Sequence, residues 1–461
     1  MFRGKFRRIH FIGIGGSGMS GIAEVLLNMG FSVSGSDLKE GPVLARLRGL
    51  GGTIHLGHAP ENVAGADVVV RSTAVKEDNP ELVAAIAAKI PVIPRAEMLA
   101  ELMRLKYGVG VAGTHGKTTT TSMVAKLLHT AGLDPTVVIG GKLDTFGSSA
   151  RLGSGEYLVA EADESDGSFL LLDPTVAIVT NIDPEHMEHW GDFDKLVDGF
   201  VQFANKVPFY GFSVVCLDHP VVQRILPRLR RRTFTYGFSA QAEYRADRIR
   251  QEGRSLVFRV WRHGEPLGEL ELDQPGRHNV LNALAATAVA MELDVPFSQV
   301  QAGLHGFGGV DRRFSQRADV GGVLIVDDYG HHPVEIQATL AAAAEGYDDR
   351  RIVAVFQPHR YSRVASLMDD FCQSFNAASQ VLVLPIYAAG EAPIEGVSQA
   401  ALVQGIAERG HRGVQAVASV DEAVDVLEAL VRPGDLVITL GAGDVNRACG
   451  LLAARLGRAS P

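Results

Sequence analysis

The stretch Gly108-Val109-Gly110-Val111-Ala112-Gly113-Thr114-His115-Gly116-Lys117-Thr118 decides how the middle of this 461-residue chain folds. Residues 108–112 are short and apolar, which predicts a buried strand, and a helical pattern at 119–128 follows the glycine-rich loop. In such a loop backbone N–H groups hold phosphates, a lysine reaches the β- and γ-phosphate oxygens, and a threonine hydroxyl ligates Mg²⁺. The stretch therefore predicts an ATP or GTP site formed by Gly113, Thr114, His115, Gly116, Lys117, Thr118 and Thr119.

This loop departs from the full GxxxxGK[ST] pattern, because Val111 stands where the first glycine belongs. The predicted strand and helix around it still favour a phosphate site over a chance Gly-Lys-Thr tripeptide in an exposed loop. A non-catalytic nucleotide-binding switch is one alternative, and it predicts ATP binding without substrate-dependent phosphate release.

A second glycine motif, Gly13-x-Gly15-x-x-Gly18, follows an apolar run near the N-terminus and opens a helical pattern. Asp37 lies 19 residues beyond Gly18, after a further strand, which is the spacing of a dinucleotide-binding fingerprint. The glycines let the backbone approach a diphosphate, and the acid holds a ribose. The motif fits a nicotinamide cofactor or another nucleotide diphosphate, so an NAD-dependent oxidoreductase is a second alternative, and glycines used only for close packing a third.

Apolar strand patterns alternate with helical patterns along the chain, which predicts parallel sheets covered by helices on both faces. The clearest strands are expected at 9–14, 67–70, 108–112, 157–160, 176–180, 323–326, 352–356, 381–384 and 436–440. Residues 243–272 instead predict antiparallel hairpins attached to a parallel sheet. We expect three α/β domains: a Rossmann-like domain at 1–106, a P-loop-type domain at 107–311 with a mostly parallel sheet and the added hairpins, and a second Rossmann-like domain at 312–461.

The composition is that of a globular protein, with 46% hydrophobic and 21% charged residues and a net charge of −9. This acidic balance argues against nucleic acid or an anionic membrane as a partner. Cys216, Cys372 and Cys449 form no CxxC pair, so neither structural zinc nor disulfides are expected. The apolar runs are too short for a membrane span, and we expect a cytoplasmic protein.

Polar residues follow several of the predicted strands. The stretch Glu161-Ala162-Asp163-Glu164-Ser165-Asp166 follows 157–160, and Asn181-Ile182-Asp183-Pro184-Glu185-His186 follows 176–180. Ligands of open α/β sheets bind at the carboxyl ends of strands, so a carboxylate there is well placed for a metal. The alternatives are acids that only solvate a loop and a histidine with a structural role.

The C-terminal third carries two similar clusters. Asp327-Asp328-Tyr329-Gly330-His331-His332-Pro333 follows 323–326, and Phe356-Gln357-Pro358-His359-Arg360 follows 352–356. Histidine, arginine and aspartate at adjacent strand ends predict a site, although each single histidine also fits a structural role. Arg312-Arg313 lies at the hinge before this third and is either a solvated pair or a clamp for charge.

Taken in order, these motifs resemble the Mur ligase family, the ATP-dependent amino-acid ligases of peptidoglycan synthesis, over essentially the whole chain. The family's short phosphate loop, Gly-Thr-His/Asn-Gly-Lys-Thr, explains the departure at Val111. Residues 13–20, 161–166, 327–333 and 356–361 are most similar to the branch that joins L-alanine to the lactyl carboxylate of UDP-N-acetylmuramate through an acyl phosphate. The branch that attaches a whole tripeptide to the same UDP-sugar in murein recycling is the alternative.

The resemblance also implies site residues and cofactors. The UDP-sugar would be held by Gly15, Gly16, Ser17, Gly18, Met19, Asp37, Ser72 and Thr73. ATP would meet the phosphate loop, with Asn279 and Asn282 at the adenine end and Arg313, Asp327 and Tyr329 closing over the nucleotide. Two Mg²⁺ ions would be ligated by Thr118, Glu161 and His186.

The same resemblance places His331, His332, His359 and Arg360 near the incoming alanine, and His331 or His332 would accept the proton of its amine. The catalytic residues are accordingly predicted to be Lys117, His186, His331, His332 and Arg360. Sister ligases carry a carbamylated lysine fourteen residues after the metal histidine; Phe200 stands there, so none is expected. A monomer or homodimer is expected.

Overall fold

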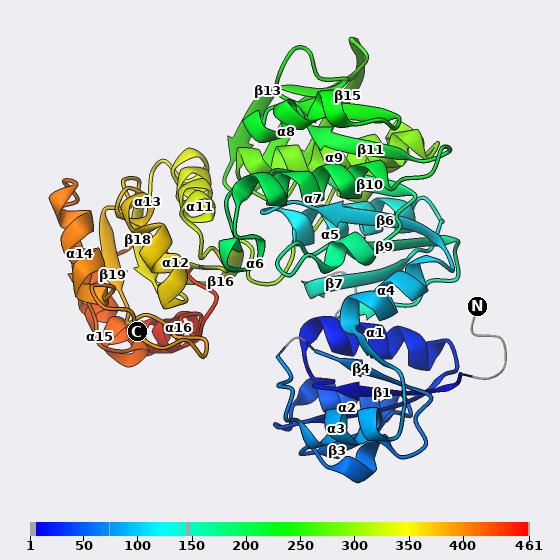
Figure 1. Ribbon diagram of the computed structural model, residues 1–461. Helices are drawn as coiled ribbons and strands as arrows, with labels where there is room; N and C mark the ends of the chain where they lie inside the picture. The colour runs from blue at the N-terminus through cyan, green and yellow to red at the C-terminus, as the bar shows by residue number, and fades with distance from the viewer. Residues whose placement is uncertain (1–5, 73, 144–147, 460–461) are drawn as a thin grey trace. The chain divides into compact units, whose positions relative to one another are not determined.

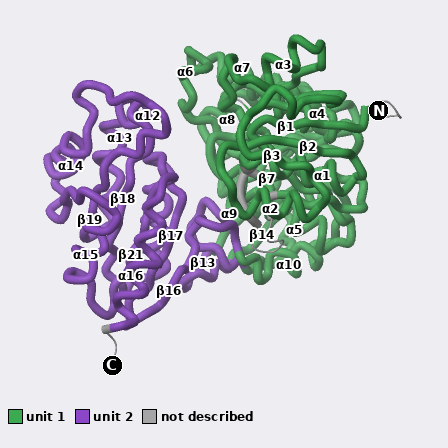
Figure 2. Tube along the Cα trace, turned by 90° about the horizontal axis from the view of Figure 1, so that it is seen from below, with its two compact units in different colours: residues 1–248, 258–271, 281–308 green, residues 249–257, 272–280, 309–461 purple. Residues whose placement is uncertain are grey.

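The computed structural model describes residues 6–72, 74–143 and 148–459, which form three β-sheets flanked by helices (Figure 1). Internal contacts divide the chain into two compact units (Figure 2). Unit 1 comprises Met1–Arg248, Phe258–Glu271 and Leu281–Gly308, and unit 2 comprises Ile249–Val257, Leu272–Val280 and Gly309–Pro461. The expected α/β class and three-domain organisation are confirmed, whereas the boundaries at 106 and 311 stay predictions.

The N-terminal part of unit 1 is built on a parallel five-stranded sheet with the order β3-β2-β1-β4-β5. Its strands are β1 (Arg8–Ile12), β2 (Ser32–Asp37), β3 (Thr53–Leu56), β4 (Val68–Arg71) and β5 (Val92–Pro94), and its helices are α1 (Ser17–Asn28), α2 (Pro42–Gly49), α3 (Pro80–Ala87) and α4 (Arg95–Met103). The strand order reverses between β1 and β4, and a crevice for ligands lies at such a switch point in open α/β sheets.

The second sheet has ten strands in the order β15-β14-β13-β12-β11-β10-β6-β9-β7-β8 and lies mostly in unit 1. Its strands are β6 (Tyr107–Ala112), β7 (Thr136–Leu143), β8 (Ser148–Arg151), β9 (Tyr157–Glu161), β10 (Val176–Val179), β11 (Phe212–Cys216), β12 (Thr233–Gly237), β13 (Tyr244–Glu252), β14 (Ser255–Arg262) and β15 (Glu265–Leu272). Its helices are α5 (Lys117–Thr130), α6 (Met187–Trp190), α7 (Phe193–Asn205), α8 (Pro220–Ile225), α9 (Arg277–Glu292) and α10 (Phe297–Leu304). Residues 249–257 and 272–280, which include parts of β13, β14 and β15 and the start of α9, belong to unit 2.

Strand β6 lies between β9 and β10 and runs parallel to both. The three segments that follow these strands therefore emerge at one edge of the sheet. They are the lysine-bearing loop, the acidic stretch that starts at Glu161, and the stretch that ends at His186. Two-residue turns join β13 to β14 and β14 to β15, so these neighbouring strands form the antiparallel hairpins expected at 243–272.

Unit 2 contains a six-stranded sheet with the order β16-β17-β21-β18-β19-β20, parallel except for the edge strand β16. Its strands are β16 (Ser315–Val320), β17 (Val323–Asp328), β18 (Arg351–Phe356), β19 (Gln380–Val383), β20 (Val414–Ala416) and β21 (Asp435–Leu440). Its helices are α11 (Pro333–Gly346), α12 (Tyr361–Ser366), α13 (Met368–Cys372), α14 (Gln399–Glu408), α15 (Val420–Leu430) and α16 (Arg447–Ala459).

Alternate residues of β18 enter separate apolar clusters on the two faces of this sheet, which is why the strand reads as continuously apolar. Ala354 and Phe356 belong to one cluster, and Val353 and Val355 to the other. Across residues 6–72, 74–143 and 148–459, no helix combines the length and the apolar composition that crossing a membrane requires.

Candidate active site

The loop between β6 and α5 is tied to the segment after β10. Gly113 has a φ of +140°, and a Cβ atom there would lie 1.9 Å from Thr180 Oγ1, so only glycine fits. The backbone N–H of His115 donates to Asn181 Oδ1 at 2.7 Å, and Thr180 Oγ1 donates to the His115 carbonyl at 2.7 Å. These bonds hold the loop in place before any ligand arrives.

Of the two predicted asparagines on α9, Asn282 lies against this loop. Its Oδ1 accepts a hydrogen bond from Thr120 Oγ1 at 3.1 Å and would lie 2.7 Å from a Cβ atom at Gly116. Asn279 is bonded within its own segment, where Nδ2 donates to the Pro275 carbonyl at 2.7 Å. In unit 1, therefore, Asn282 is positioned beside the predicted phosphate site.

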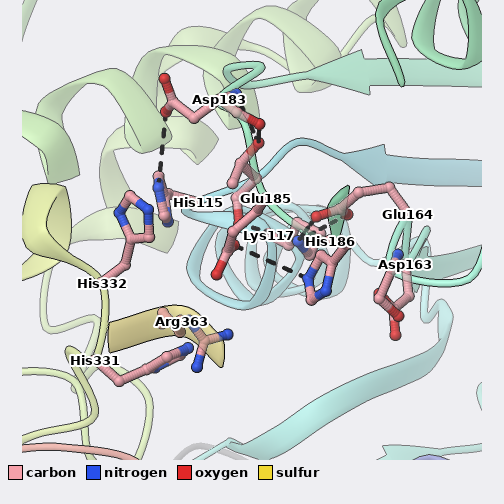
Figure 3. Close-up of polar contacts among 12 residues, drawn as sticks. His115, Lys117, Asp163, Glu164, Asp183, Glu185, His186, His331, His332 and Arg363 are labelled. Atoms are coloured by element: carbon pink, nitrogen blue, oxygen red, sulfur yellow. Dashed lines mark hydrogen bonds and ion pairs between the residues drawn. The ribbon is translucent and has the colours of Figure 1, made fainter. Parts of the chain in front are cut away.

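Lys117 is bound by a buried carboxylate (Figure 3). Its Nζ lies 3.0 and 2.9 Å from the two carboxylate oxygens of Glu164, whose side chain is 1% exposed, and 3.1 Å from the Thr114 carbonyl. Burial opposes the charge on Lys117, but the adjacent Glu164 and Asp163 outweigh it and raise the pKa of the lysine. Lys117 is therefore a fixed cation at the mouth of the loop.

Three side chains at this edge of the sheet suit a metal ion. One ligand atom each from Glu164, Glu185 and His186 lies within 4.8 Å of the others, and Figure 3 shows these residues beside Lys117. His186 adopts a left-handed backbone conformation with φ +57°, which is uncommon outside glycine and clusters at functional sites. Carboxylate oxygens are the ligands that Mg²⁺ prefers, so the donor set fits this ion.

The predicted metal ligands are only partly brought together here. His186 belongs to this group of acidic and histidine side chains, whereas Glu161, at the end of β9, does not. Thr118 lies in the first turn of α5, directly after the phosphate loop, and stays a predicted ligand. Glu164 and Glu185 complete the group; both lie in the stretches 161–166 and 181–186, but neither was predicted as a metal ligand. Their positions in the sequence could have indicated this role, because each residue follows a strand that neighbours β6.

The first glycine motif lines a cavity of about 860 Å³ in the N-terminal part of unit 1. Gly15, Gly16, Asp37 and Ser72 of the predicted set are on its wall. The Asp37 carboxylate accepts a hydrogen bond from the Gly15 N–H at 2.8 Å and another from the Leu38 N–H at 2.8 Å. Asp37 thus stabilises the glycine turn, and both of its carboxylate oxygens accept hydrogen bonds from backbone N–H groups.

Other members of that set are placed differently. Met19 is 2% exposed and its side chain packs in the hydrophobic core, so only its backbone could contact the UDP-sugar as predicted. A Cβ atom at Gly18 would lie 3.1 Å from a guanidinium nitrogen of Arg95. Thr73 lies outside the described residues, as does the side chain of Ser17.

In unit 2, Asp327 is fully buried and bonded on both oxygens. Arg312 and Arg317 donate to Oδ2 at 3.2 and 3.1 Å, and Thr439 Oγ1 donates to Oδ1 at 2.8 Å. Arg313 pairs with Glu335 at 3.3 Å, and its guanidinium lies 5.5 Å from the ring centre of Tyr329. The structure thus joins the predicted Arg313 to Tyr329, while Asp327 organises the strand end beneath them.

The adjacent histidines of unit 2 are in different environments. His332 caps α11, where its Nδ1 accepts a hydrogen bond from the Val334 N–H at 3.4 Å, so this ring nitrogen carries no proton. His331 Nδ1 lies 3.1 Å from the Tyr329 carbonyl, which only accepts, so here Nδ1 is the donor and Nε2 keeps its lone pair. Only His331 has the tautomer expected of a proton acceptor on Nε2.

His359 stacks on Tyr387, with ring centres 5.4 Å apart, and lies 6.0 Å from the ring of His331. Burial, with the neighbouring His331 and arginines, lowers the pKa of His359 to about 4, so this ring is neutral at pH 7. Arg360 lies 3.8 Å from Glu391. Within unit 2, then, His331, His359 and Arg360 form the polar cluster predicted from the two strand ends.

Three consecutive segments match models of one family. Residues 8–107 match "Mur ligase family, catalytic domain", residues 111–290 match "Mur ligase middle domain", and residues 312–443 match "Mur ligase, glutamate ligase domain". These matches follow the order of the three sheets along the chain.

Individual proteins agree with this result. A UDP-N-acetylmuramate–L-alanine ligase of Geobacter sp. (strain M21) is 58% identical over 442 residues, which is 96% of each chain. The crystal structure of a UDP-N-acetylmuramate-alanine ligase from Thermotoga maritima superposes with a TM-score of 0.83 at 29% identity, covering 98% of this chain and 100% of that one. A UDP-N-acetylmuramate:L-alanyl-gamma-D-glutamyl-meso-diaminopimelate ligase from Neisseria meningitides is 30% identical with a TM-score of 0.61, covering 67% of this chain and 100% of that one.

Matches in all three segments, together with a relative more than half identical over nearly the full length, show that this chain belongs to the Mur ligase family.

Proposed function

We propose that this chain joins L-alanine to the lactyl carboxylate of UDP-N-acetylmuramate at the expense of ATP, in peptidoglycan precursor synthesis. The observation that carries the proposal is the 58% identity, over 96% of both chains, to a relative named for this reaction. A solved murein peptide ligase from Psychrobacter arcticus also covers 98% of this chain, but with a TM-score of 0.70 against 0.83 for the alanine ligase, which favours the single amino acid as acceptor. An NAD-dependent oxidoreductase is not supported, because the family is one of ligases.

The two glycine loops divide the binding of substrates between them. The cavity that contains Gly15, Gly16 and Asp37 holds the UDP-sugar, with the backbone of the glycine turn toward its diphosphate. The loop before α5 holds the ATP phosphates, and Asn282 lies beside it. Both loops belong to unit 1.

The first chemical step transfers a phosphoryl group. An oxygen of the lactyl carboxylate attacks the γ-phosphorus, the bond to the β-phosphate oxygen breaks, and ADP leaves an acyl phosphate behind. Lys117 neutralises charge on the transferring group, since positioning and electrostatic stabilisation supply most of such a step. His186, with Glu164 and Glu185, would hold Mg²⁺, and Thr118 and Glu161 are the further ligands that the family resemblance implies for a pair of ions. When bound, Mg²⁺ would add positive charge that neutralises the phosphates.

The second step forms the amide. The neutral amine of L-alanine attacks the carbonyl carbon of the acyl phosphate, inorganic phosphate leaves, and the amine gives up a proton. His331 accepts this proton on Nε2, because its Nδ1 is already the donor to a carbonyl, whereas His332 is committed to its helix cap. His359 and Arg360 line the same cluster and orient the amino acid.

Phosphate release tests the proposal. Purified protein with ATP and Mg²⁺ is given UDP-N-acetylmuramate, L-alanine, or both, and the product is identified by mass. The proposal expects sustained release only with both substrates, and one alanine added to the sugar nucleotide. Equal or better turnover with the tripeptide would establish the recycling reaction instead, and ATP binding without release under any condition would support the nucleotide-binding switch. We also propose that the protein is cytoplasmic and that it is a monomer or a homodimer.

A further inference from the structure

A buried polar network crosses the N-terminal sheet beneath the cavity at the first glycine motif. Glu81, in the first turn of α3, and His10, in the middle of β1, are both fully buried, in a sheet whose other inward residues are mostly apolar. Ser36, at the end of β2, is buried as well, and His58 has a side chain that is 15% exposed. These four residues come from four separate segments of the chain.

The Glu81 carboxylate is the centre of this network. Its Oε2 accepts a hydrogen bond from Ser36 Oγ at 2.5 Å and lies 3.3 Å from His58 Nδ1 and 3.6 Å from His10 Nε2. Its Oε1 accepts from Asn62 Nδ2 at 2.5 Å. Although burial raises the pKa of a carboxyl, the nearby His10 ring and the hydrogen bonds from Ser36 and Asn62 outweigh it and lower the pKa of Glu81 to about 2. Glu81 is therefore ionised, and its carboxylate can accept hydrogen bonds but cannot donate them.

This arrangement determines which nitrogen of His58 carries the proton. The Ser36 hydroxyl has one hydrogen, and it donates this hydrogen in its bond to the ionised Glu81. The 2.9 Å contact between Ser36 Oγ and His58 Nδ1 then requires Nδ1 to be the donor. In the neutral ring Nε2 is consequently a hydrogen-bond acceptor, and among the described residues it has no protein partner.

His58 also lines the cavity of about 860 Å³ that contains Gly13, Gly15, Gly16 and Asp37. A buried carboxylate is costly compared with an apolar side chain of similar size, so a network of this kind is poorly explained by stability alone. Among the described residues of this network, His58 is the one that lines the cavity. The network thus ends at the surface where a nucleotide would lie.

We propose that Glu81 is a positioning residue for nucleotide binding, which acts through Ser36 to fix His58 with Nε2 as an acceptor for an N–H or O–H donor of the nucleoside. The inference rests on the proposed function, because it takes the cavity to be the uridine diphosphate site. The donor is either the ribose 2′-hydroxyl or the N3–H of uracil, since both are neutral donors that an unprotonated Nε2 can bind.

Calorimetric binding of UDP, together with steady-state kinetics, tests the proposal. His58→Ala and Glu81→Gln should each raise the Kd for UDP and the KM for the UDP-sugar about five- to tenfold, while kcat and the KM for ATP change less than twofold. In the double variant the Kd should equal that of His58→Ala, because Glu81 acts only through His58. Additive effects, or a wild-type Kd in His58→Ala, would overturn the proposal.

Two further arms keep the test decisive. Glu24→Gln is the matched control: it alters another mostly buried carboxylate of the N-terminal part of unit 1, which pairs with Arg46 at 2.7 Å outside the network and does not line the cavity, and it should leave UDP binding unchanged. Ser36→Ala replaces Glu81→Gln if the latter does not fold, and it too should weaken UDP binding, at least twofold. Unchanged binding in a folded Ser36→Ala protein contradicts the relay.

The probe 2′-deoxy-UDP separates the two donors. If the ribose 2′-hydroxyl is the donor, His58→Ala should not weaken binding of the deoxy compound, whereas a base donor predicts the same loss for both nucleotides. Failure of wild-type protein to bind UDP at all would count against the proposed function itself. Wild-type binding with unaffected variants would count against this inference alone.

Discussion

Lys117 and Glu164 form an ion pair in which Nζ lies 2.9 Å from Oε2, inside the loop that the sequence assigns to ATP phosphates. The carboxylate is almost fully buried, so the pair is not screened by water as a surface pair would be. A phosphate that enters the loop meets a lysine already neutralised by a neighbour. Nucleotide binding therefore has to redistribute the charge around Lys117.

Lys117→Ala should remove nearly all ATP turnover, by about 10³-fold or more, because Lys117 is the cation held at the mouth of the loop, where it would neutralise the transferring phosphoryl group. UDP binding should survive, since that cavity is built on other strands. Lys126→Ala, on the same helix, is the control and should keep wild-type turnover. Coupled ADP-release assays measure both variants; wild-type turnover in Lys117→Ala would refute the phosphate site.

Glu164→Gln should have opposite effects on nucleotide and metal. Without Mg²⁺, ADP should bind more tightly, by about threefold or more, because Lys117 is freed from its carboxylate. The Mg²⁺ concentration for half-maximal activity should rise about tenfold, because one candidate ligand is lost. Titration with ADP in the presence of EDTA measures the affinity for the nucleotide. Titration with Mg²⁺ in turnover assays measures the Mg²⁺ concentration for half-maximal activity. Glu188→Gln, whose side chain is 66% exposed beside His186, provides the comparison.

The two adjacent histidines of unit 2 should differ in their effect on amide formation. His331→Ala should slow alanine addition about 10²-fold while ATP-dependent formation of the acyl phosphate persists, detected by trapping with hydroxylamine. His332→Asn keeps a residue that caps helices well and should stay within a fewfold of wild type. The reverse order of effects would assign the proton transfer to His332.

Stability at acid pH should depend on Glu81. Its pKa is about 2 in the folded protein against an ordinary 4.5, so its ionised form stabilises the fold above pH 4.5, and this contribution is lost as the pH falls toward 2. The shift corresponds to about 3 kcal/mol at most. Between pH 5 and pH 3, wild type should lose more thermal stability than Glu81→Gln, followed by circular dichroism. Parallel losses would show that the carboxylate is not specially stabilised.

Local patterns predicted the strands and loops well. The strand expected at 108–112 is β6 (Tyr107–Ala112), and the strand expected at 9–14 is β1 (Arg8–Ile12), which ends earlier because Gly13 turns the chain with a φ of +79°. Each loop follows its strand within a few residues, so its place at the sheet edge is fixed by chain connectivity.

Contacts between distant segments escaped prediction. Which carboxylate of 161–166 faces Lys117 depends on the turn after β9, where the Gly167 N–H donates to the Glu164 carbonyl at 3.2 Å. The network of Glu81, Ser36 and His58 joins residues 22 to 45 positions apart, and no periodicity marks it. Likewise, the sequence left His331 and His332 equivalent, and only the hydrogen bonds of each ring separate them.

The bonds that join the phosphate loop to Thr180 and Asn181 have a thermodynamic consequence. The same short segment continues to Glu185 and His186, so a ligand that orders the loop also restrains the residues suited to a cation. Linkage then makes the cooperativity mutual: whatever factor Mg²⁺ adds to the affinity for nucleotide, the nucleotide adds to the affinity for Mg²⁺. Mg²⁺ and nucleotide are therefore expected to bind cooperatively. The change in the affinity for one ligand when the other is added measures how strongly this segment couples the two sites.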